Sequence, residues 1–156
     1  MLDVGIIRRA SINDLDDIVK IEHRCFQGDS AYSKKQLKYL LLKAKSICLT
    51  EVNNNEIRGY IIVLFKTRSN IAGIETIGVD PAFRGKGVGV RLLTAAEENI
   101  LLLGLKRIRL EVSTKNITAL NLYKKLGYLP IELLTNYYIF ENYGTRNAYR
   151  MIKELT

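Results

Sequence analysis

The sequence predicts a single α/β domain over residues 1–156, with the element order βααβββαβαββ. The length suits one domain that can bury a sizeable core. Apolar side chains recur in two patterns, the alternation or short runs typical of strands and the wider spacing typical of helices. A glycine-rich loop also joins an apolar run, Ile71 to Val79, to a long helical pattern. No internal repeat, linker or low-complexity segment interrupts this order.

The first part of the chain supplies three strands and two helices before that apolar run. We expect a strand over Val4 to Arg9, a helix capped by Ser11 that runs to about Cys25, and a second helix capped by Ser33. Asn53, Asn54 and Asn55 form a hairpin signal between the two strands that follow. These two strands are predicted over Ser46 to Val52 and Ile57 to Thr67.

The later part begins with the long helix, which Gly104 ends. Its buried stripe is predicted to contain Leu92, Leu93, Ala96, Ile100 and Leu103. Arg107 to Ser113 alternates as a strand, and Asn116 can cap a short helix that ends at Gly127. The stripe of this short helix holds Ala119, Leu120, Tyr123 and Leu126. Tyr128 to Phe140 and Arg146 to Ile152 are predicted to close the chain as a hairpin around Asn142, Tyr143 and Gly144.

Composition and charge exclude several classes of protein. The net charge is +8, but the basic residues are scattered and no aromatic RNA-binding signature accompanies them, so direct nucleic-acid recognition is not expected. No apolar run is long enough for a membrane span, and Met1 to Val4 lacks a signal-peptide pattern. Cys25 and Cys48 form no metal or redox motif, which predicts reduced thiols, no metal and a cytoplasmic location.

The loop after the apolar run has the features of an anion site. Arg84-x-x-Gly87-x-Gly89 follows a strand and opens a helix, so its backbone N–H groups and the helix dipole can face a phosphate. A Walker loop is excluded because Lys86 is followed by glycine. A dinucleotide fingerprint is excluded because its last glycine position is Val90.

This loop resembles the acetyl-CoA pyrophosphate loop of the GNAT acyltransferases. The segment from Leu110 to Tyr128, L-E-V-S-T-K-N-I-T-A-L-N-L-Y-K-K-L-G-Y, is similar to that of their RimI-like branch. So is the ending, Tyr137-Tyr138 followed by Asn147-Ala148-Tyr149-Arg150-Met151. The resemblance implies a mixed, largely antiparallel twisted sheet flanked by helices. It also implies acetyl transfer from acetyl-CoA to the α-amino group of protein N-termini, with possible ribosome association and no membrane.

The same resemblance assigns residues to the coenzyme. The backbone of Ile77, Gly78 and Val79, at the end of the apolar run, would pair with the pantetheine arm. Ile74 and Ile77 would point to opposite faces of a regular strand, so burial of both on one face suggests a bulge near Thr76. A strand buried on both faces would explain the same pattern. Asn116 would bind the arm or serve only as a helix cap. The loop residues assigned to the coenzyme are Arg84, Gly85, Lys86, Gly87, Val88 and Gly89.

The catalytic residues are also assigned by resemblance. Glu111 matches the general base, and from periodicity alone it is a surface glutamate paired with Arg109. Tyr123 matches the general acid near the coenzyme sulfur, and its place on the apolar stripe also fits core packing. Relatives with a catalytic His or Tyr on the preceding strand place it where this chain has Gly73, which leaves Glu75 as a second candidate base.

The acceptor would meet Phe26, Tyr32, Tyr137 and Tyr138. The branch usually has Pro-Trp-Ser where this chain has Ala31-Tyr32-Ser33, so the accepted N-terminal residue is left open. Two alternatives also remain open. The acceptor could be a lysine or a small-molecule amine, or the chain could be a non-catalytic basic module that binds ribosomes or nucleic acid.

Overall fold

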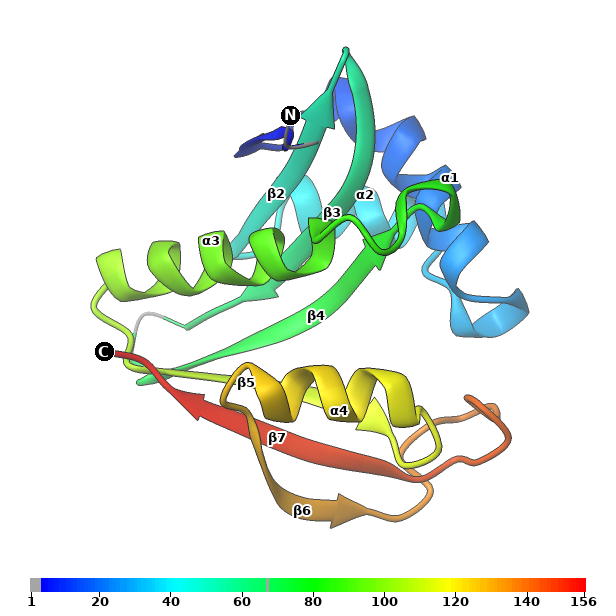
Figure 1. Cartoon of the computed structure of the whole chain (residues 1–156), viewed down its shortest axis with the longest axis vertical. Helices are drawn as coiled ribbons and strands as arrows, with labels where there is room; N and C mark the ends of the chain where they lie inside the picture. The colour runs from blue at the N-terminus through cyan, green and yellow to red at the C-terminus, as the bar shows by residue number, and fades with distance from the viewer. Residues whose placement is uncertain (1–3, 67) are drawn as a thin grey trace.

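Strand pairing in the computed structural model, which describes residues 4–66 and 68–156, produces one mixed sheet with helices on both faces (Figure 1). The strands of the described ranges are β1 (Ile6–Arg9), β2 (Ser46–Asn53), β3 (Glu56–Leu64), β4 (Ile71–Val79), β5 (Arg107–Ser113), β6 (Leu129–Leu134) and β7 (Ala148–Glu154). The helices are α1 (Leu15–Cys25), α2 (Lys34–Leu42), α3 (Val88–Leu102) and α4 (Ile117–Lys125). Short 3₁₀ turns cover Ile12–Asp14, Gly28–Ser30 and Pro81–Phe83. The predicted order and fold class are confirmed.

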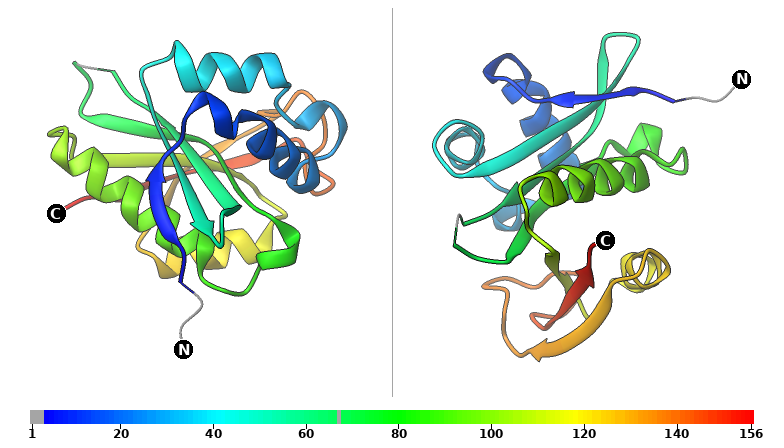
Figure 2. Two further views of the ribbon diagram at one scale, coloured as in Figure 1. Left: turned by 90° about the horizontal axis from the view of Figure 1, so that it is seen from above. Right: turned by 90° about the vertical axis from the view of Figure 1, so that its left-hand side faces the viewer.

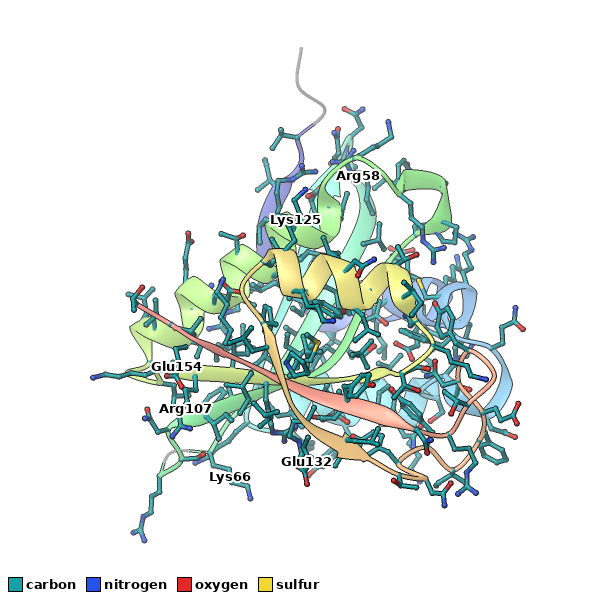
Figure 3. The ribbon with its side chains drawn as sticks, turned by 60° about the horizontal axis from the view of Figure 1, so that its bottom comes forward. Arg58, Lys66, Arg107, Lys125, Glu132 and Glu154 are labelled. Carbon is teal, nitrogen blue, oxygen red and sulfur yellow. The ribbon has the colours of Figure 1, made fainter. Side chains whose placement is uncertain are left out.

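The strand order in the sheet is β1-β2-β3-β4-β5-β7-β6. Neighbouring strands pair antiparallel except β4 and β5, which run parallel. Arg107 on β5 and Glu154 on β7 are directly opposite each other, with 3.8 Å between Nε and Oε1 (Figure 3). The sheet is therefore mixed but largely antiparallel, as the sequence predicts.

Helices cover the two faces of the sheet, α3 and α4 on one and α1 and α2 on the other (Figure 2), and an apolar cluster lies under each pair. One cluster lies under α3 and α4 and contains Leu92, Ile100 and Leu120 together with Ile61 of β3. The other lies under α1 and α2 and includes Tyr60 of β3. Because successive side chains of a strand point to opposite faces, Tyr60 and Ile61 belong to different clusters. Within the described ranges, none of the helices has the length and apolar character to cross a bilayer.

Several predicted boundaries need correction. The stretch after Ser11 begins as a 3₁₀ turn, and α1 itself starts at Leu15. Leu103 is 50% exposed rather than on the buried stripe, because α3 ends at Leu102 and the next turn reverses at Gly104 with φ 83°. The strand predicted to end at Thr67 ends at Leu64, and Thr67 and the first three residues of the N-terminus lie outside the described residues.

The closing hairpin is also shorter than expected. β6 stops at Leu134 because Asn136 has a φ of 53°, a left-handed conformation that breaks a strand. Tyr137 and Tyr138 consequently lie in the connection between β6 and β7, where the Tyr138 N–H still donates to the carbonyl of Arg146 at 3.0 Å.

A matched pair of leucines on α3 tests the assignment of its buried face. Leu92→Ala should lower the free energy of unfolding by roughly 2–5 kcal/mol, because Leu92 is fully buried and its removal leaves a cavity. Leu102→Ala should change it by less than about 0.5 kcal/mol, because Leu102 is 87% exposed. Urea unfolding followed by circular dichroism measures both values. Equal losses would contradict the assignment.

Candidate active site

The site begins where β4 and β5 stop pairing. Their parallel register holds for three residue pairs, and the last of them is Gly73 with Arg109. Beyond this point β4 pairs only with β3, while β5 continues beside β7 (Figure 1). The backbone of Ile77, Gly78 and Val79 therefore has no ladder partner on the β5 side, as an added pantetheine strand requires.

A β-bulge sits in the middle of β4. Ile62 is opposite Thr76 and Val63 is opposite Ile74, so Glu75 is the extra residue. Ile74 and Ile77 consequently contact the same apolar cluster despite their opposite parity. The predicted bulge near Thr76 is confirmed, and it leaves the Glu75 side chain exposed.

The glycine-rich loop connects β4 to α3 through the Pro81–Phe83 turn. Gly85 and Gly87 have φ values of 78° and 79°, a conformation that residues with a Cβ adopt at a cost. Val88 is buried and fixes the first turn of α3, whereas Arg84 to Gly87 are exposed. The start of this helix thus presents a bare backbone to solvent and suits a pyrophosphate.

Arg84 extends from the loop toward the end of α1. Its Nη2 lies 3.7 Å from the Cys25 Sγ, and the Cys25 thiol donates to the Val79 carbonyl at 3.2 Å. Burial raises the pKa of Cys25, so the thiol stays protonated at neutral pH. These contacts tie α1 to the point where β4 enters the loop.

Glu111 of β5 is held by two arginines and a tyrosine. Arg109 Nη1 donates to both carboxylate oxygens at 2.8 and 3.0 Å, and Arg150 Nε on β7 donates to Oε2 at 3.2 Å. The Tyr137 hydroxyl donates to Oε1 at 3.3 Å. The pairing with Arg109 exists as periodicity suggests, but the Glu111 side chain is only 10% exposed, so it is not an ordinary surface glutamate.

Gly73 makes room for Arg109. A Cβ built on Gly73 would lie 2.9 Å from the Arg109 Cζ, so the guanidinium lies across the strand where a side chain at 73 would stand. The Arg109 guanidinium therefore occupies the space that a catalytic side chain at position 73 would need. Arg109 lies two residues from Glu111 along β5, and Arg150 is directly opposite Glu111 on β7, so both lie on its face of the sheet. The sequence predicted the pairing with Arg109 but not the contact from Arg150.

Glu75 receives a hydrogen bond from the Tyr32 hydroxyl. Burial and the Glu75 carboxylate both raise the pKa of Tyr32. Tyr32 is anchored from the backbone, since its N–H donates to the buried Glu22 at 3.0 Å and its carbonyl lies 2.9 Å from His23 Nε2. Phe26 is half-buried at the end of α1, at the start of the same connection.

Two tyrosines, Tyr137 and Tyr138, lie near Glu111. The rings of Tyr137 and Tyr138 meet edge to face with centroids 5.1 Å apart. Burial raises the pKa of Tyr137, and the charges of Glu111 and Glu75 raise it further, so both carboxylates lie near this hydroxyl. Burial and then Tyr137 raise the pKa of Tyr138, with smaller contributions from Glu111 and Tyr123. The predicted acceptor tyrosines and both candidate bases therefore converge, whereas within the described residues no hydrogen bond or ring contact joins Phe26 to them.

Tyr123 lies on α4 and packs against the main apolar cluster, with its ring 5.8 Å from that of Tyr128. Burial, with a contribution from Tyr143, raises the pKa of Tyr123 to about 12. The phenol is therefore protonated at neutral pH, as a general acid must be. Asn116 caps α4, because its Oδ1 accepts from the Ala119 N–H at 3.2 Å. The structural alternatives from the sequence, core packing by Tyr123 and helix capping by Asn116, are thus both present in the structure.

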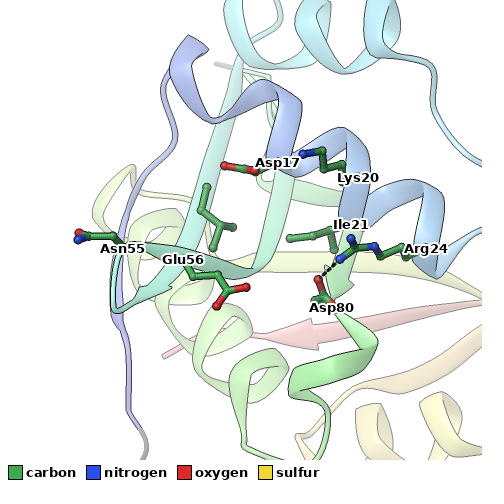
Figure 4. Close-up of a pocket in the computed structure, with 8 residues that line it drawn as sticks. Asp17, Lys20, Ile21, Arg24, Asn55, Glu56 and Asp80 are labelled. Atoms are coloured by element: carbon green, nitrogen blue, oxygen red, sulfur yellow. Dashed lines mark hydrogen bonds and ion pairs between the residues drawn. The ribbon is translucent and has the colours of Figure 1, made fainter.

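A separate groove of about 250 Å³ lies between α1 and the β2–β3 turn (Figure 4). Arg24 donates to Asp80 at 2.6 Å along one side of it. None of the predicted site residues lines this groove. Among the described residues, no group of three His, Cys, Asp or Glu side chains could hold a metal ion.

Sequence comparison shows which proteins the chain is similar to. It is 31% identical over 140 residues to the N-alpha-acetyltransferase RimI of Mycobacterium tuberculosis, covering 86% of this chain and 83% of that protein. It is 31% identical over 141 residues to an uncharacterized N-acetyltransferase of Methanocaldococcus jannaschii, covering 82% of this chain. The match spans only 62% of that relative, and only 34% of an uncharacterized Mycobacterium leprae protein that is 34% identical over 127 residues.

Solved structures share the fold. The ribosomal-protein-S18-alanine N-acetyltransferase of Escherichia coli aligns with a TM-score of 0.87 and 23% identity, covering 97% of this chain and 94% of that one. A Bacillus subtilis acetyltransferase in complex with CoA aligns with a TM-score of 0.79 and 23% identity, covering 97% and 99%. The model of the acetyltransferase (GNAT) family matches residues 14–128. With its bare loop at the start of α3 and its unpaired edge of β4, both suited to acetyl-CoA, the chain belongs to the acetyltransferase (GNAT) family.

Proposed function

We propose that this protein transfers the acetyl group of acetyl-CoA to the free α-amino group of protein N-termini, in the cytoplasm. The observation that carries this proposal is the convergence of Glu111 and Glu75 with Tyr137 beside the diverging edges of β4 and β5. The similarity to an N-alpha-acetyltransferase, of which the match covers 83%, supports the same acceptor. A ribosomal protein is a candidate substrate, because one further relative is named as a ribosomal protein bS18-alanine N-acetyltransferase and another as a putative one.

The acceptor's chemistry matches a site with carboxylate bases. A peptide α-amine has a pKa near ~7.8, against ~10.4 for lysine, so deprotonating lysine costs roughly 3.5 kcal/mol more. Arg109 and Arg150 hold the Glu111 carboxylate in place. This carboxylate would accept the amine proton through a water molecule. The Tyr123 phenol would give a proton to the leaving thiolate.

The surroundings of the two carboxylates can hold a peptide. The hydroxyls of Tyr32, Tyr137 and Tyr138 can bond peptide backbone, which every N-terminus presents. A pocket of about 500 Å³ next to Tyr32 offers space for side chains of the acceptor. Its lining residues are Tyr32, Lys35, Gln36, Tyr39 and Leu40.

Paired peptides test the acceptor. One peptide has a free N-terminus and a blocked internal lysine, and its partner of the same sequence has a blocked N-terminus and a free lysine. We expect mass spectrometry to show faster acetylation of the first, because its amine is easier to deprotonate. Faster acetylation of the second would contradict the α-amine proposal and leave the family membership unaffected. A small-molecule amine as the best acceptor would contradict it as well.

Substitution of each carboxylate tests which is the base. Glu111→Gln should lower kcat by roughly 10²–10⁴-fold, because the amide cannot accept the proton but can still accept hydrogen bonds from the arginines. Calorimetry should show unchanged affinity for acetyl-CoA. Glu75→Gln is the matched control, with a smaller loss expected. Full activity in Glu111→Gln, together with a large loss in Glu75→Gln, would move the role of base to Glu75.

The role of Tyr123 is tested by removing only its hydroxyl. Tyr123→Phe should slow the single-turnover rate of acetyl transfer by roughly 10²-fold or more. The ring still packs against the core, so the unfolding midpoint should change little. Because the pKa of Tyr123 is about 12, the wild-type rate should not fall through loss of this proton until the pH approaches that value. A wild-type rate in Tyr123→Phe would leave Tyr123 with a packing role alone.

A further inference from the structure

Glu51 of β2 is a fully buried carboxylate shared by two arginines behind the glycine-rich loop. Arg91 of α3 donates to it in a two-pronged contact, from Nε at 2.8 Å and from Nη2 at 3.0 Å. Arg58 of β3, itself 2% exposed, donates from Nη2 to the same carboxylate. Burial alone would raise the pKa of Glu51, but the hydrogen bonds from Arg91 and Arg58 bring it below its ordinary value.

Arg91 connects this carboxylate to the end of the loop. Its Nη1 donates to the Lys86 carbonyl at 2.9 Å. A Cβ built on Gly87 would lie 2.8 Å from the same nitrogen, so the guanidinium packs directly against the loop backbone. One arginine thus spans the distance between a buried strand and the residues that face the coenzyme.

Arg58 connects the carboxylate to the start of the loop. Its backbone carbonyl accepts from the Asp80 N–H at 2.8 Å, where β4 ends. Its guanidinium lies over the ring of Phe83, 5.7 Å from the centroid, and Figure 3 shows Arg58 near this turn. Both ends of the loop are therefore attached to the same buried anion.

The positions of Glu51 and Arg91 each cost free energy unless the two charges pair with each other. A carboxylate with no exposed surface is unfavourable without good pairing. A cation near the N-terminus of a helix is opposed by the helix dipole, and Arg91 lies close to that end of α3. Glu51 offsets the unfavourable position of Arg91, and Arg91 in turn keeps the Lys86 carbonyl turned inward, away from a phosphate.

We propose that Glu51 is a positioning residue for the coenzyme: through Arg91 and Arg58 it fixes the pyrophosphate loop in the conformation that receives acetyl-CoA. The proposal rests on the coenzyme assigned to this site, and it does not depend on which amine is acetylated. Glu51 makes no contact with the coenzyme in this proposal. Its effect is to arrange the loop N–H groups before binding, which lowers the cost of ordering them.

The test is the dissociation constant of coenzyme A, measured by calorimetry in the absence of any acceptor. Glu51→Gln should raise it roughly ten-fold, which corresponds to the loss of one charge-assisted hydrogen bond. Arg91→Lys keeps the charge but cannot hold Glu51 and the Lys86 carbonyl together, so it should raise the constant several-fold. Hydrogen exchange should also become faster at residues 84–89 of both free variants.

A second carboxylate provides the matched control. Asp14 is 6% exposed and forms a two-pronged pair with Arg8, at 2.8 and 3.0 Å, near the start of α1. Asp14→Asn removes a comparable ion pair and should leave the affinity for coenzyme A unchanged, even where it lowers the unfolding midpoint. With an accepted peptide, Glu51→Gln should raise the KM for acetyl-CoA and leave kcat at saturation unchanged.

Two results would overturn the proposal. The first is unchanged affinity for coenzyme A in folded Glu51→Gln, or in Arg91→Lys where Glu51→Gln does not fold. The second is an equal loss of affinity in Asp14→Asn, which would show a general effect of stability. Failure of the peptide experiments would leave this outcome unaffected, because coenzyme binding is measured without a peptide.

Discussion

The parallel pairing between β4 and β5 ends after Gly73 and Arg109, and the rest of the site depends on this limit. On the β4 side, divergence leaves the backbone of Ile77 to Val79 paired with β3 but without a ladder partner on the β5 side, and polar backbone groups need such partners when they are withdrawn from water. On the β5 side, the strand continues beside β7, where Glu111 is opposite Arg150 and accepts a hydrogen bond from it. A fully paired sheet would place a strand where we propose that the coenzyme arm lies.

The sequence predicted the architecture well, because each element has an apolar pattern that agrees with its place in the sheet. Ile71–Val79 was predicted with its observed bounds, and the caps at Ser33 and Asn116 are confirmed by hydrogen bonds to the third following residue. The errors lie at ends that depend on single residues. Asn136 ends β6 through a positive φ that Asn adopts more readily than most residues, but nothing in the local pattern requires it there.

The candidate site was only partly predictable. The residues of the loop themselves predicted an anion site, whereas Glu111 and Tyr123 were assigned by resemblance to the RimI-like branch. Contacts between distant strands could not be read in the same way. The sequence does not show that Arg109 lies across Gly73, that Arg150 reaches Glu111, or that Tyr32 donates to Glu75. Each of these contacts depends on the register of paired strands or on the path of a connection, which is set by the whole fold.

Arginine–glutamate contacts organise both ends of the site in the same way. At the coenzyme end Glu51 is shared by Arg58 and Arg91, and at the acceptor end Glu111 is shared by Arg109 and Arg150. A guanidinium suits this task because its planar donors can hold a carboxylate and a second acceptor at once, as Arg91 does with Glu51 and Lys86. The two glutamates differ in exposure, 0% against 10% for their side chains. The fully buried one suits the positioning role that we propose for Glu51, whereas the more open one suits the proposed role of Glu111 beside the acceptor, so similar pairs are proposed to support different tasks.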